Sequence, residues 1–307
     1  MEKERKINSD IPSRIAELQS IMKESVLKYK LYRILLRGKG LEFESYRDYT
    51  QNDDASSIDW KASMRANKIL VKQYKEEKNL KIMFLVDVSD NMVFGSTEKL
   101  KCEYASEIMA AFSHLIITTG DKVGSIFFSD KIKSHSKPEG GDRSFHKIVN
   151  EITNASLYGG AQNLDMVFKY VLDYLGREID SLVIISDFIS FSKDTKKKLE
   201  FIAQKFETVL LSVRDPLDNT LPDFKGEINI QDPRTGQQML LDPRIAKGFY
   251  ERYAFEQQEM IRKLCRDNGV DFLEIRTSEP FVPALAEFLK GRVKQTGARH
   301  YGRSQLY

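Results

Sequence analysis

Apolar and polar positions follow two repeating patterns along most of the chain. Short, almost uniformly apolar runs, such as 81–88 and 181–188, alternate with longer segments in which apolar residues recur every three to four positions, such as 97–119. The first pattern is typical of strands that are buried on both faces, and the second is typical of amphipathic helices. The chain is therefore predicted to have an α/β fold, in which a doubly wound, mostly parallel sheet is covered by helices on both faces.

The same patterns predict the order of the elements. Residues 215–242 interrupt the alternation, and two short runs around "DPRTG" within them predict a β-hairpin insertion. The short run 131–136 is expected to be a strand at the edge of the sheet. The other predicted strands are 81–88, 121–128, 181–188, 207–213 and 270–277, and the predicted helices are 97–119, 143–153, 164–175, 192–205, 243–267 and 283–290.

The part before residue 80 has a different pattern. Apolar residues at helical spacing predict a helix over 11–37, and short alternating runs at 40–49 and 67–74 predict two strands. The segment 51–66 between these strands is expected to be an ordered connecting loop. The predicted parts are an N-terminal helix and small β module at 1–79, the sheet domain with its hairpin insertion at 80–292, and a flexible basic tail at 293–307.

Charge and cysteine content exclude several classes of protein. The 307 residues include 48 basic and 45 acidic side chains, so the net charge of +3 gives no global attraction to nucleic acid or to a membrane. The basic charges of the tail alone are typical of a solvated terminus. The first ten residues lack the apolar core of a signal peptide, and no later run reaches the ~20 apolar residues of a membrane span, so we expect a cytoplasmic protein. Cys102 and Cys265 lie in predicted helices and are expected to be core thiols.

Polar side chains end two of the predicted strands. Asp87, Ser89 and Asn91 follow the strand at 81–88, and Asp187 ends the strand at 181–188. Ligands of parallel sheets bind beyond the carboxyl ends of the strands, so both carboxylates are expected at one edge. Two carboxylates repel unless a cation or proton lies between them, and hard oxygen ligands suit Mg²⁺ or Mn²⁺. The alternative is that Asp87 and Ser89 only accept hydrogen bonds from the following turn, which predicts no dependence on a cation.

These residues resemble the metal-ion-dependent adhesion site of von Willebrand factor A domains. That site is written D-x-S-x-S after the first strand, with an aspartate after the fourth strand. Asp87, Ser89 and Asp187 match this pattern, and Asn91 stands in place of the second serine. The resemblance implies a von Willebrand factor A-type fold and a bound Mg²⁺ or Mn²⁺ ion, with one coordination position open to a carboxylate of a partner protein.

The second loop of this site departs from the family pattern. The family's glycine pair is present as Gly159 and Gly160, but Ala161 stands where the family has a threonine, and its methyl group cannot bind a cation. Gln162 and Asn163 follow directly, and their amide groups are long enough to reach the same edge. We therefore expect Gln162 and Asn163 to contribute to partner binding, with or without a cation.

A second resemblance covers the segment before the sheet. It is similar to the Y-x-x-G-D-D-x-R-x-I-D-W-x-x-x-A-R pattern of the family catalogued as domain of unknown function 58, with Asn52 replacing the glycine and Ser56 the first arginine. The likeness continues through "RDPLDNTLP", "DPRTG" and "NGVDFLEIRT" and covers residues 38–292. It implies an adaptor or co-chaperone for a MoxR-type AAA+ ATPase and a client protein. The matching residues are Tyr49, Asp53, Asp54, Ile58, Asp59, Trp60, Lys61 and Arg65.

The charged residues of this segment have two interpretations. Asp53, Asp54 and Asp59 lie within seven positions of one another, and basic residues flank them. One interpretation is a structural knot of ion pairs, in which Trp60 anchors the small module to the sheet. The other is a docking surface that includes these aspartates, Trp60 and Arg65, or an acidic phosphoryl-transfer site.

Two functions of different classes remain. The first is a non-enzymatic protein-protein interaction module that binds through the degenerate adhesion site. The second is a metal-dependent hydrolase that uses the clustered aspartates to activate water. The hydrolase has less support, because a hydrolytic site generally needs a general acid or base beside the metal, and the sequence pattern identifies none. The sequence also contains neither a phosphate-binding loop nor a nucleophile elbow, which are typical of other enzyme classes. The four histidines, His114, His135, His146 and His300, do not have the spacing of metal ligands either.

Overall fold

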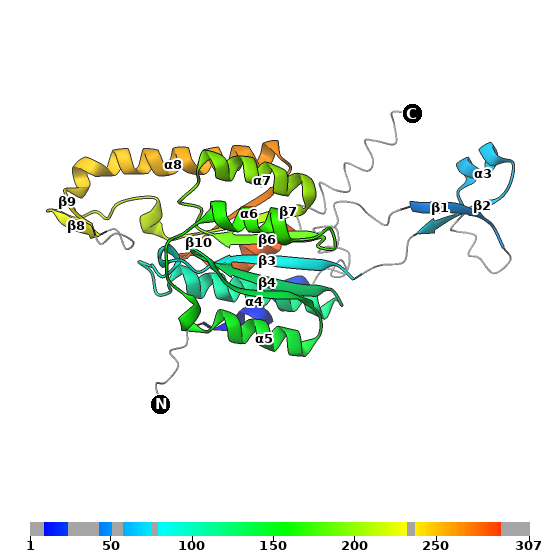
Figure 1. The fold of residues 1–307 in the computed structure, drawn as a ribbon, viewed down its shortest axis with the longest axis horizontal. Coiled ribbons are helices and arrows are strands. Elements are labelled where there is room, and N and C mark those ends of the chain that lie inside the picture. Colours follow the sequence, from blue (N-terminus) through cyan, green and yellow to red (C-terminus); the bar gives the residue numbers. More distant parts are fainter. Residues whose placement is uncertain (1–8, 24–42, 51–57, 75–78, 232–236, 290–307) are drawn as a thin grey trace.

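A six-stranded sheet forms the centre of the molecule (Figure 1). The computed structural model describes residues 9–23, 43–50, 58–74, 79–231 and 237–289. Strands lie in the order β10-β7-β6-β3-β4-β5, and all neighbours pair in parallel except β5, which is an antiparallel edge strand. The predicted fold class and the predicted edge strand are confirmed. The strands are β3 (Lys81–Asp87), β4 (Lys122–Phe128), β5 (Ile132–Glu139), β6 (Ser181–Ser186), β7 (Glu207–Arg214) and β10 (Asp271–Arg276).

Helices cover both faces of this sheet because its strands are apolar on both sides. Ile82, Phe84 and Val86 of β3 pack into the core layer on the side of α4, whereas Met83 and Leu85 pack into the layer on the side of α6. One side carries α1 (Ile11–Lys23), α4 (Lys101–Thr118), α5 (Asp142–Ile152) and a helix at 281–289; the other carries α6 (Leu164–Tyr174), α7 (Lys193–Lys205) and α8 (Pro243–Asp267) (Figure 1).

The N-terminal helix belongs to the sheet layers. Helix α1 packs against α4, and Ile11 is buried in the same core layer. The buried carboxylate of Glu107 on α4 accepts a hydrogen bond of 2.6 Å from the backbone N–H of Asp10, and it also pairs with Lys99. The sequence grouped this helix with the β module at 1–79, whereas the structure places α1 on the sheet domain.

A small module is formed by β1 (Phe43–Asp48), α3 (Trp60–Ala66) and β2 (Leu70–Tyr74), with the two strands antiparallel. It lies at one end of the molecule, beyond the edges of the helical layers (Figure 1). The prediction of a connecting loop over 51–66 is wrong for its second half, because Asp59 accepts hydrogen bonds from the backbone N–H groups of Lys61 and Ala62 and so caps α3.

The predicted hairpin insertion is present as β8 (Ile228–Gln231) and β9 (Gln238–Leu241), which pair antiparallel directly before α8. Short 3-10 helices also lie in the described loops of the sheet domain: η2 (Asp90–Met92), η3 (Ala155–Leu157) and η4 (Pro216–Asp218). Within the described ranges, no helix combines the length and the apolar character that a membrane span requires.

One buried carboxylate outside the candidate site gives a pH-dependent prediction. Asp121 precedes β4 and is fully buried, and its Oδ1 accepts a hydrogen bond of 2.7 Å from the backbone N–H of Leu80. Burial raises the pKa of Asp121 to about 6, although the Leu80 N–H lowers it. The folded state therefore binds this proton more tightly than the unfolded state. The stabilising contribution is fully present below about pH 4 and is lost as the pH rises through 6.

Asp121→Asn retains an acceptor for Leu80 and removes the titration. Between pH 4 and pH 7, we expect the free energy of unfolding to fall more for the unmodified protein than for the variant. The difference between the two decreases is expected to be roughly 1 to 2 kcal/mol. Urea unfolding at a series of pH values measures this difference. Parallel pH profiles for the two proteins would contradict it.

Candidate functional site

Two aspartates meet at the carboxyl edge of the sheet. Asp87 ends β3 and Asp187 follows the neighbouring strand β6, so the parallel pairing brings both side chains to one edge. The side-chain nitrogen Nε2 of Gln162 donates to both carboxylates, at 2.5 Å from Asp87 Oδ2 and 2.7 Å from Asp187 Oδ1. Both aspartates are fully buried. The structure thus brings the predicted pair together, but it places the carboxylates below the surface and not on an open rim.

A glycine loop positions Gln162 between the two aspartates. Gly159 and Gly160 have φ angles of 118° and 95°, which other residues rarely adopt. The N–H of Gly159 donates to the carbonyl of Val88 at 2.7 Å, and a Cβ on Gly160 would lie only 2.6 Å from Asp130 Oδ1. Because the glycine loop is held this close to the ends of the strands, the side chain of Gln162, two positions after Gly160, reaches into the site.

The orientation of the Gln162 amide is fixed by a second contact. Its oxygen Oε1 accepts a hydrogen bond of 2.9 Å from the backbone N–H of Ser190, so the NH₂ group must face the aspartates. The Ser186 hydroxyl also donates to Asp87 Oδ2, at 2.6 Å. Gln162 therefore reaches the site as the sequence suggested, but it contributes a hydrogen-bond donor and not a ligand oxygen.

A lysine that the sequence analysis missed supplies positive charge to the site. Lys101 is the first residue of α4 and its side chain is only 1% exposed. Its Nζ lies 2.8 Å from Asp187 Oδ2, and 3.1 Å and 3.0 Å from the two carboxylate oxygens of Asp218. The ring centroid of Phe94 is 5.7 Å from the same ammonium group. A protein cation thus contacts Asp187, one of the two carboxylates predicted to bind a cation.

The pKa values follow from this unequal distribution of charge. Burial raises the pKa of Asp87 to about 6, the negative charge of Asp187 adds to the effect, and hydrogen bonds from Ser186 and Ser89 oppose it. Burial would also raise the pKa of Asp187, but Lys101, together with the charge of Arg214 and the hydrogen bond from Gln162, outweighs burial, so the pKa of Asp187 is below its ordinary value. The pKa of Lys101 is raised: burial lowers it, but Asp187 and Asp218 together more than compensate.

Asp215 connects three loops beside these charges. This buried carboxylate accepts hydrogen bonds from the backbone N–H and the hydroxyl of Ser96, at 2.7 Å and 2.5 Å. It also accepts from the backbone N–H of Leu217 at 2.9 Å and from the hydroxyl of Thr277 at 3.2 Å. The segments after β3, β7 and β10 are therefore held together by one side chain.

The remaining predicted ligands contribute less than expected. Ser89 is fully buried; its backbone N–H donates to Asp87 Oδ1 at 2.9 Å, and its hydroxyl has no hydrogen-bond partner in the described structure. Asn91 lies half-buried in η2, and no hydrogen bond joins it to either aspartate among the described residues. The hydrogen bond from the Ser89 N–H to Asp87 is the contact expected if Asp87 only accepts hydrogen bonds from the turn after β3.

The arrangement does not fit a Mg²⁺ or Mn²⁺ ion held by Asp87, Ser89, Asn91 and Asp187. An NH₂ group already contacts both carboxylates and the Lys101 ammonium contacts Asp187, so donors lie where a cation would need free oxygen ligands. Within the described ranges, no group of three or more His, Cys, Asp or Glu side chains is placed to hold a metal ion. The feature that favours a bound ligand is the buried Ser89 hydroxyl, which has no hydrogen-bond partner among the described residues. Metal binding stays a prediction.

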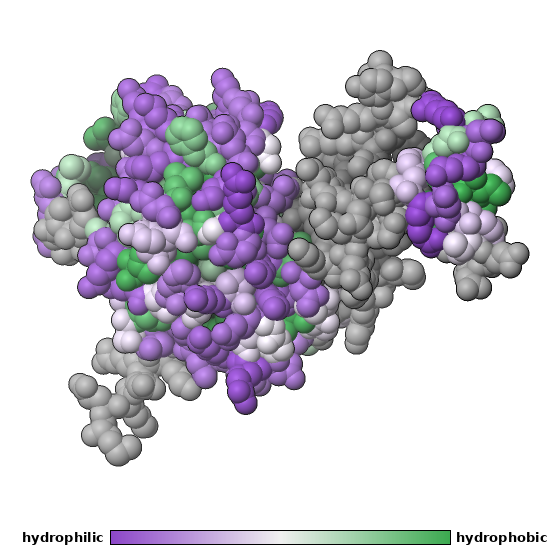
Figure 2. Space-filling view, turned by 45° about the vertical axis from the view of Figure 1, so that its right-hand side comes forward, coloured by the Kyte–Doolittle hydropathy of each residue, from purple (hydrophilic) through white to green (hydrophobic). Residues whose placement is uncertain are grey.

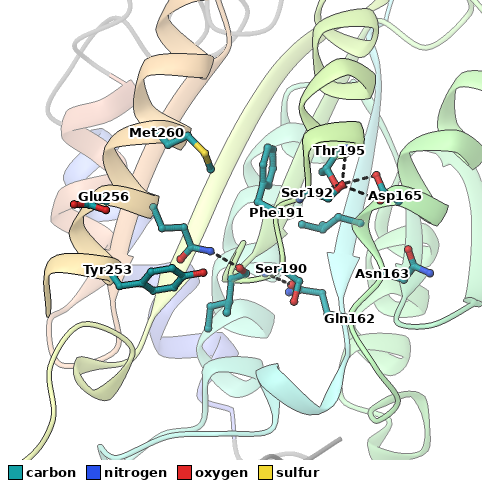
Figure 3. Close-up of a pocket in the computed structure, with 13 residues that line it drawn as sticks. Gln162, Asn163, Asp165, Ser190, Phe191, Ser192, Thr195, Tyr253, Glu256 and Met260 are labelled. Atoms are coloured by element: carbon teal, nitrogen blue, oxygen red, sulfur yellow. Dashed lines mark hydrogen bonds between the residues drawn. The ribbon is translucent and has the colours of Figure 1, made fainter. Parts of the chain in front are cut away.

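A hollow of about 600 Å³ lies next to the buried aspartates. Gln162 and Asn163 at the start of α6, the loop from Ile189 to Ser192 and one side of α8 surround it (Figure 3). Asn163 Oδ1 accepts a hydrogen bond of 3.0 Å from the backbone N–H of Met166 and so caps α6. Because Gln162 lines the hollow and also contacts both aspartates, a ligand in the hollow would contact a side chain that is coupled to the charged centre.

The described residues of the small module that were predicted to bind a partner lie apart from this site. Asp53 and Asp54 fall outside the described residues, and Asp59 caps α3. Trp60 is 64% exposed, so the interpretation in which Trp60 anchors the module in an interface is wrong. Arg65 follows one helical turn after Lys61, and both are exposed. These residues form a surface of their own and do not join the carboxyl edge of the sheet.

Comparison with known proteins identifies the family. The model of the family described as "Protein of unknown function DUF58" matches residues 45–260, which is more than half of the chain. The chain belongs to the DUF58 family. Its sheet, with one antiparallel edge strand and helices on both faces, agrees with the α/β fold that the sequence predicted.

Relatives of this DUF58 chain include two mycobacterial proteins. Uncharacterized protein Rv1480 of Mycobacterium tuberculosis and uncharacterized protein Mb1516 of Mycobacterium bovis are each 26% identical over 301 residues, which cover 95% of this chain and 93% of the relative. Among solved structures, BatB from Bacteroides thetaiotaomicron is similar with a TM-score of 0.49 and 14% identity, over 70% of this chain and 100% of that chain. The SpRpn10 VWA domain is similar with a TM-score of 0.37 and 11% identity, over 70% and 93%.

Proposed function

We propose that this DUF58 protein is a non-enzymatic protein-protein interaction module, and that its binding surface is formed by the outer face of α8 and the adjoining hollow. The observation that carries the proposal is a stripe of exposed apolar side chains on α8. Ile245, Phe249 and Tyr253 are spaced four residues apart, so they lie on one face, and they are 76%, 69% and 70% exposed. Large apolar side chains that are grouped and exposed in this way mark sites of association.

Two other features lie near the stripe. The β8-β9 hairpin lies at the N-terminal end of α8 and adds the exposed side chains of Met239 and Leu240 (Figure 1). At the other end, Tyr253 lines the hollow together with Gln162 and Ser190 (Figure 3). A partner that covers the stripe would therefore also reach the polar groups at the carboxyl edge of the sheet.

The partner that we propose is a MoxR-type AAA+ ATPase in the cytoplasm, with the DUF58 protein acting as an adaptor or co-chaperone for a client protein. This choice of partner is the one that the resemblance to DUF58 sequences implies. The predicted mechanism, in which a cation at Asp87, Ser89 and Asp187 receives a carboxylate of the ATPase, has less support than direct contact. The reason is that Lys101 and Gln162 already contact the two aspartates, and both aspartates are buried.

The hydrolase alternative has no comparable support. A carboxylate that activates water must reach the substrate or the attacking water. Asp87 and Asp187 are fully buried and engaged in hydrogen bonds, and Asp59 is engaged in capping α3. Asp53 and Asp54, the other aspartates of this alternative, lie outside the described residues.

Binding to the ATPase tests the proposal. We expect the purified chain to bind the purified MoxR-type ATPase of the same organism equally well in Mg²⁺ and in EDTA. The ATPase is kept in the same nucleotide state in both buffers, so that any difference in affinity reports on a cation site of this chain. The double variant Phe249→Asp, Tyr253→Asp should weaken binding at least tenfold, because two charges would be placed in an apolar contact. Isothermal titration calorimetry measures both effects.

Phe201→Asp is the matched control, because Phe201 is an exposed aromatic residue on α7 outside the proposed surface. Equal weakening by this control would place the contact elsewhere. No binding by the unmodified chain would overturn the choice of partner, and turnover of a phosphate ester by the purified chain would overturn the non-enzymatic assignment.

A further inference from the structure

The small module presents a second surface that the proposed function does not use. We propose that the outer face of α3 is a docking surface for an acidic, amphipathic segment of a partner protein. This surface comprises Trp60, Lys61, Met64 and Arg65. It is independent of the α8 stripe, and an adaptor that joins two proteins requires two such surfaces.

The apolar half of the surface consists of two side chains on successive turns. Trp60 and Met64 are four residues apart, so they lie on the same side of α3, and they are 64% and 81% exposed. Tryptophan is strongly enriched among the residues that dominate binding energy at protein interfaces, and methionine adapts its shape to different partners. Figure 2 shows hydrophobic residues of the module, at the right, directly beside strongly hydrophilic ones.

The charged half of the surface is basic and is not neutralised. Lys61 and Arg65 are also four residues apart, and neither has an ion-pair partner in the described part of the chain. The acidic groups nearby are already engaged: Asp48 pairs with Lys68 at 2.7 Å, and Asp59 accepts from two backbone N–H groups and from the Tyr46 hydroxyl. Two cations therefore remain available to carboxylates of a partner.

The two cations border a hollow that an acidic side chain would enter. The hollow has a volume of about 600 Å³ and lies between β1, α3 and β2. Lys61 and Arg65 line one side of it, and Tyr46 and Leu70 line the other. An arginine guanidinium is able to bind a carboxylate through two parallel hydrogen bonds, so the geometry favours glutamate or aspartate over a neutral residue.

The face is held in this orientation by the rest of the module. The buried hydroxyl of Ser63 donates to the carbonyl of Asp59 at 2.7 Å and accepts from the backbone N–H of Leu70 at 2.8 Å, which fixes α3 on β2. Asp59 fixes the first turn from the other end. Since α3 is fixed by Ser63 and Asp59, Trp60 and Met64 stay on the outer side, and a partner does not have to order them first.

Trp60 allows a direct test, because it is the only tryptophan in the chain. The probes are two synthetic helical peptides with the same apolar face, one with glutamate and one with lysine on the polar face. We expect the glutamate peptide to shift the emission of Trp60 to shorter wavelength and to protect it from acrylamide, with an affinity at least tenfold higher than that of the lysine peptide. The preference should disappear in high salt.

A charge-reversal variant provides the matched control. Lys61→Glu, Arg65→Glu keeps Trp60 and should reverse the preference, so that the lysine peptide binds more tightly; circular dichroism verifies that the variant is folded. The Phe249→Asp, Tyr253→Asp variant should bind the glutamate peptide as the unmodified chain does, which separates this surface from the α8 stripe. The proposal would be overturned by an equal response to both peptides or by no response to either. It would also be overturned by a shift of the Trp60 emission that depends on protein concentration without peptide, because that shift would indicate that a second copy covers the face.

Discussion

The Lys101→Met variant is expected to lose about 3 to 5 kcal/mol of its free energy of unfolding at pH 7. Methionine has a similar length and fills the buried space, but it leaves Asp187 and Asp218 without the ammonium group that both contact. A buried carboxylate without its partner costs several kcal/mol, because it has lost its hydration and gains no attraction in return. Urea unfolding followed by circular dichroism measures the change.

Two controls distinguish the loss of a buried partner from a general effect of removing lysine. Lys198→Met removes a partly exposed ion pair with Asp165 at 3.1 Å and should change the unfolding free energy by less than about 1 kcal/mol. Lys101→Met combined with Asp187→Asn should recover part of the loss, since the uncompensated charge is also removed. A loss below about 1 kcal/mol in the single variant would show that Lys101 is not the cation on which this site depends.

The same variant connects stability with the predicted metal site. If Lys101 provides the positive charge of the site, millimolar Mg²⁺ should leave the unfolding midpoint of the unmodified chain unchanged and raise the midpoint of Lys101→Met, because a ligand of the folded state stabilises it. A higher midpoint of the unmodified chain in Mg²⁺ would instead favour the prediction from the adhesion-site pattern. Thermal melting in Mg²⁺ and in EDTA gives the answer.

Asp215→Ala is expected to lower the free energy of unfolding by about 3 kcal/mol. The substitution leaves donors of Ser96, Leu217 and the buried Thr277 without their acceptor, and these donors come from three separate loops. Asp215→Asn keeps one acceptor oxygen and should lose a smaller amount. Asp223→Ala, which removes a carboxylate that is 89% exposed, is the control and should have little effect. Equal small changes in all three variants would show that Asp215 does not hold the loops together.

Strand-end residues of the site were predictable because parallel strands bring their carboxyl ends together. Asp87 and Asp187 could be paired from the sequence for that reason, although they are 100 positions apart and belong to different strands. The core layers were equally predictable, since apolar runs and helical periodicity carry the information directly. Periodicity failed for α3, because seven residues make too few turns to show it, and the capping residue Asp59 was the available signal.

The electrostatic partners of the site could not be predicted in the same way. Lys101 contacts residues that are 86 and 117 positions away, and a lysine in the first turn of a helix has the same local pattern whether it is solvated or buried. Similarly, the sequence shows that Gln162 follows the glycine pair, but the backbone N–H of Ser190 decides which end of its amide faces the aspartates. Charge compensation in the interior depends on tertiary contacts, and no short pattern encodes them.

The edge strand β5 limits how other proteins are able to associate with this one. On its outer side β5 pairs with no other strand among the described residues, and such an edge in general invites pairing with a strand of another chain. Lys133 and Lys137 add positive charge along this border, and Pro138 lacks the N–H that a ladder of hydrogen bonds would need. Extension of the sheet across molecules is therefore disfavoured at the β5 edge.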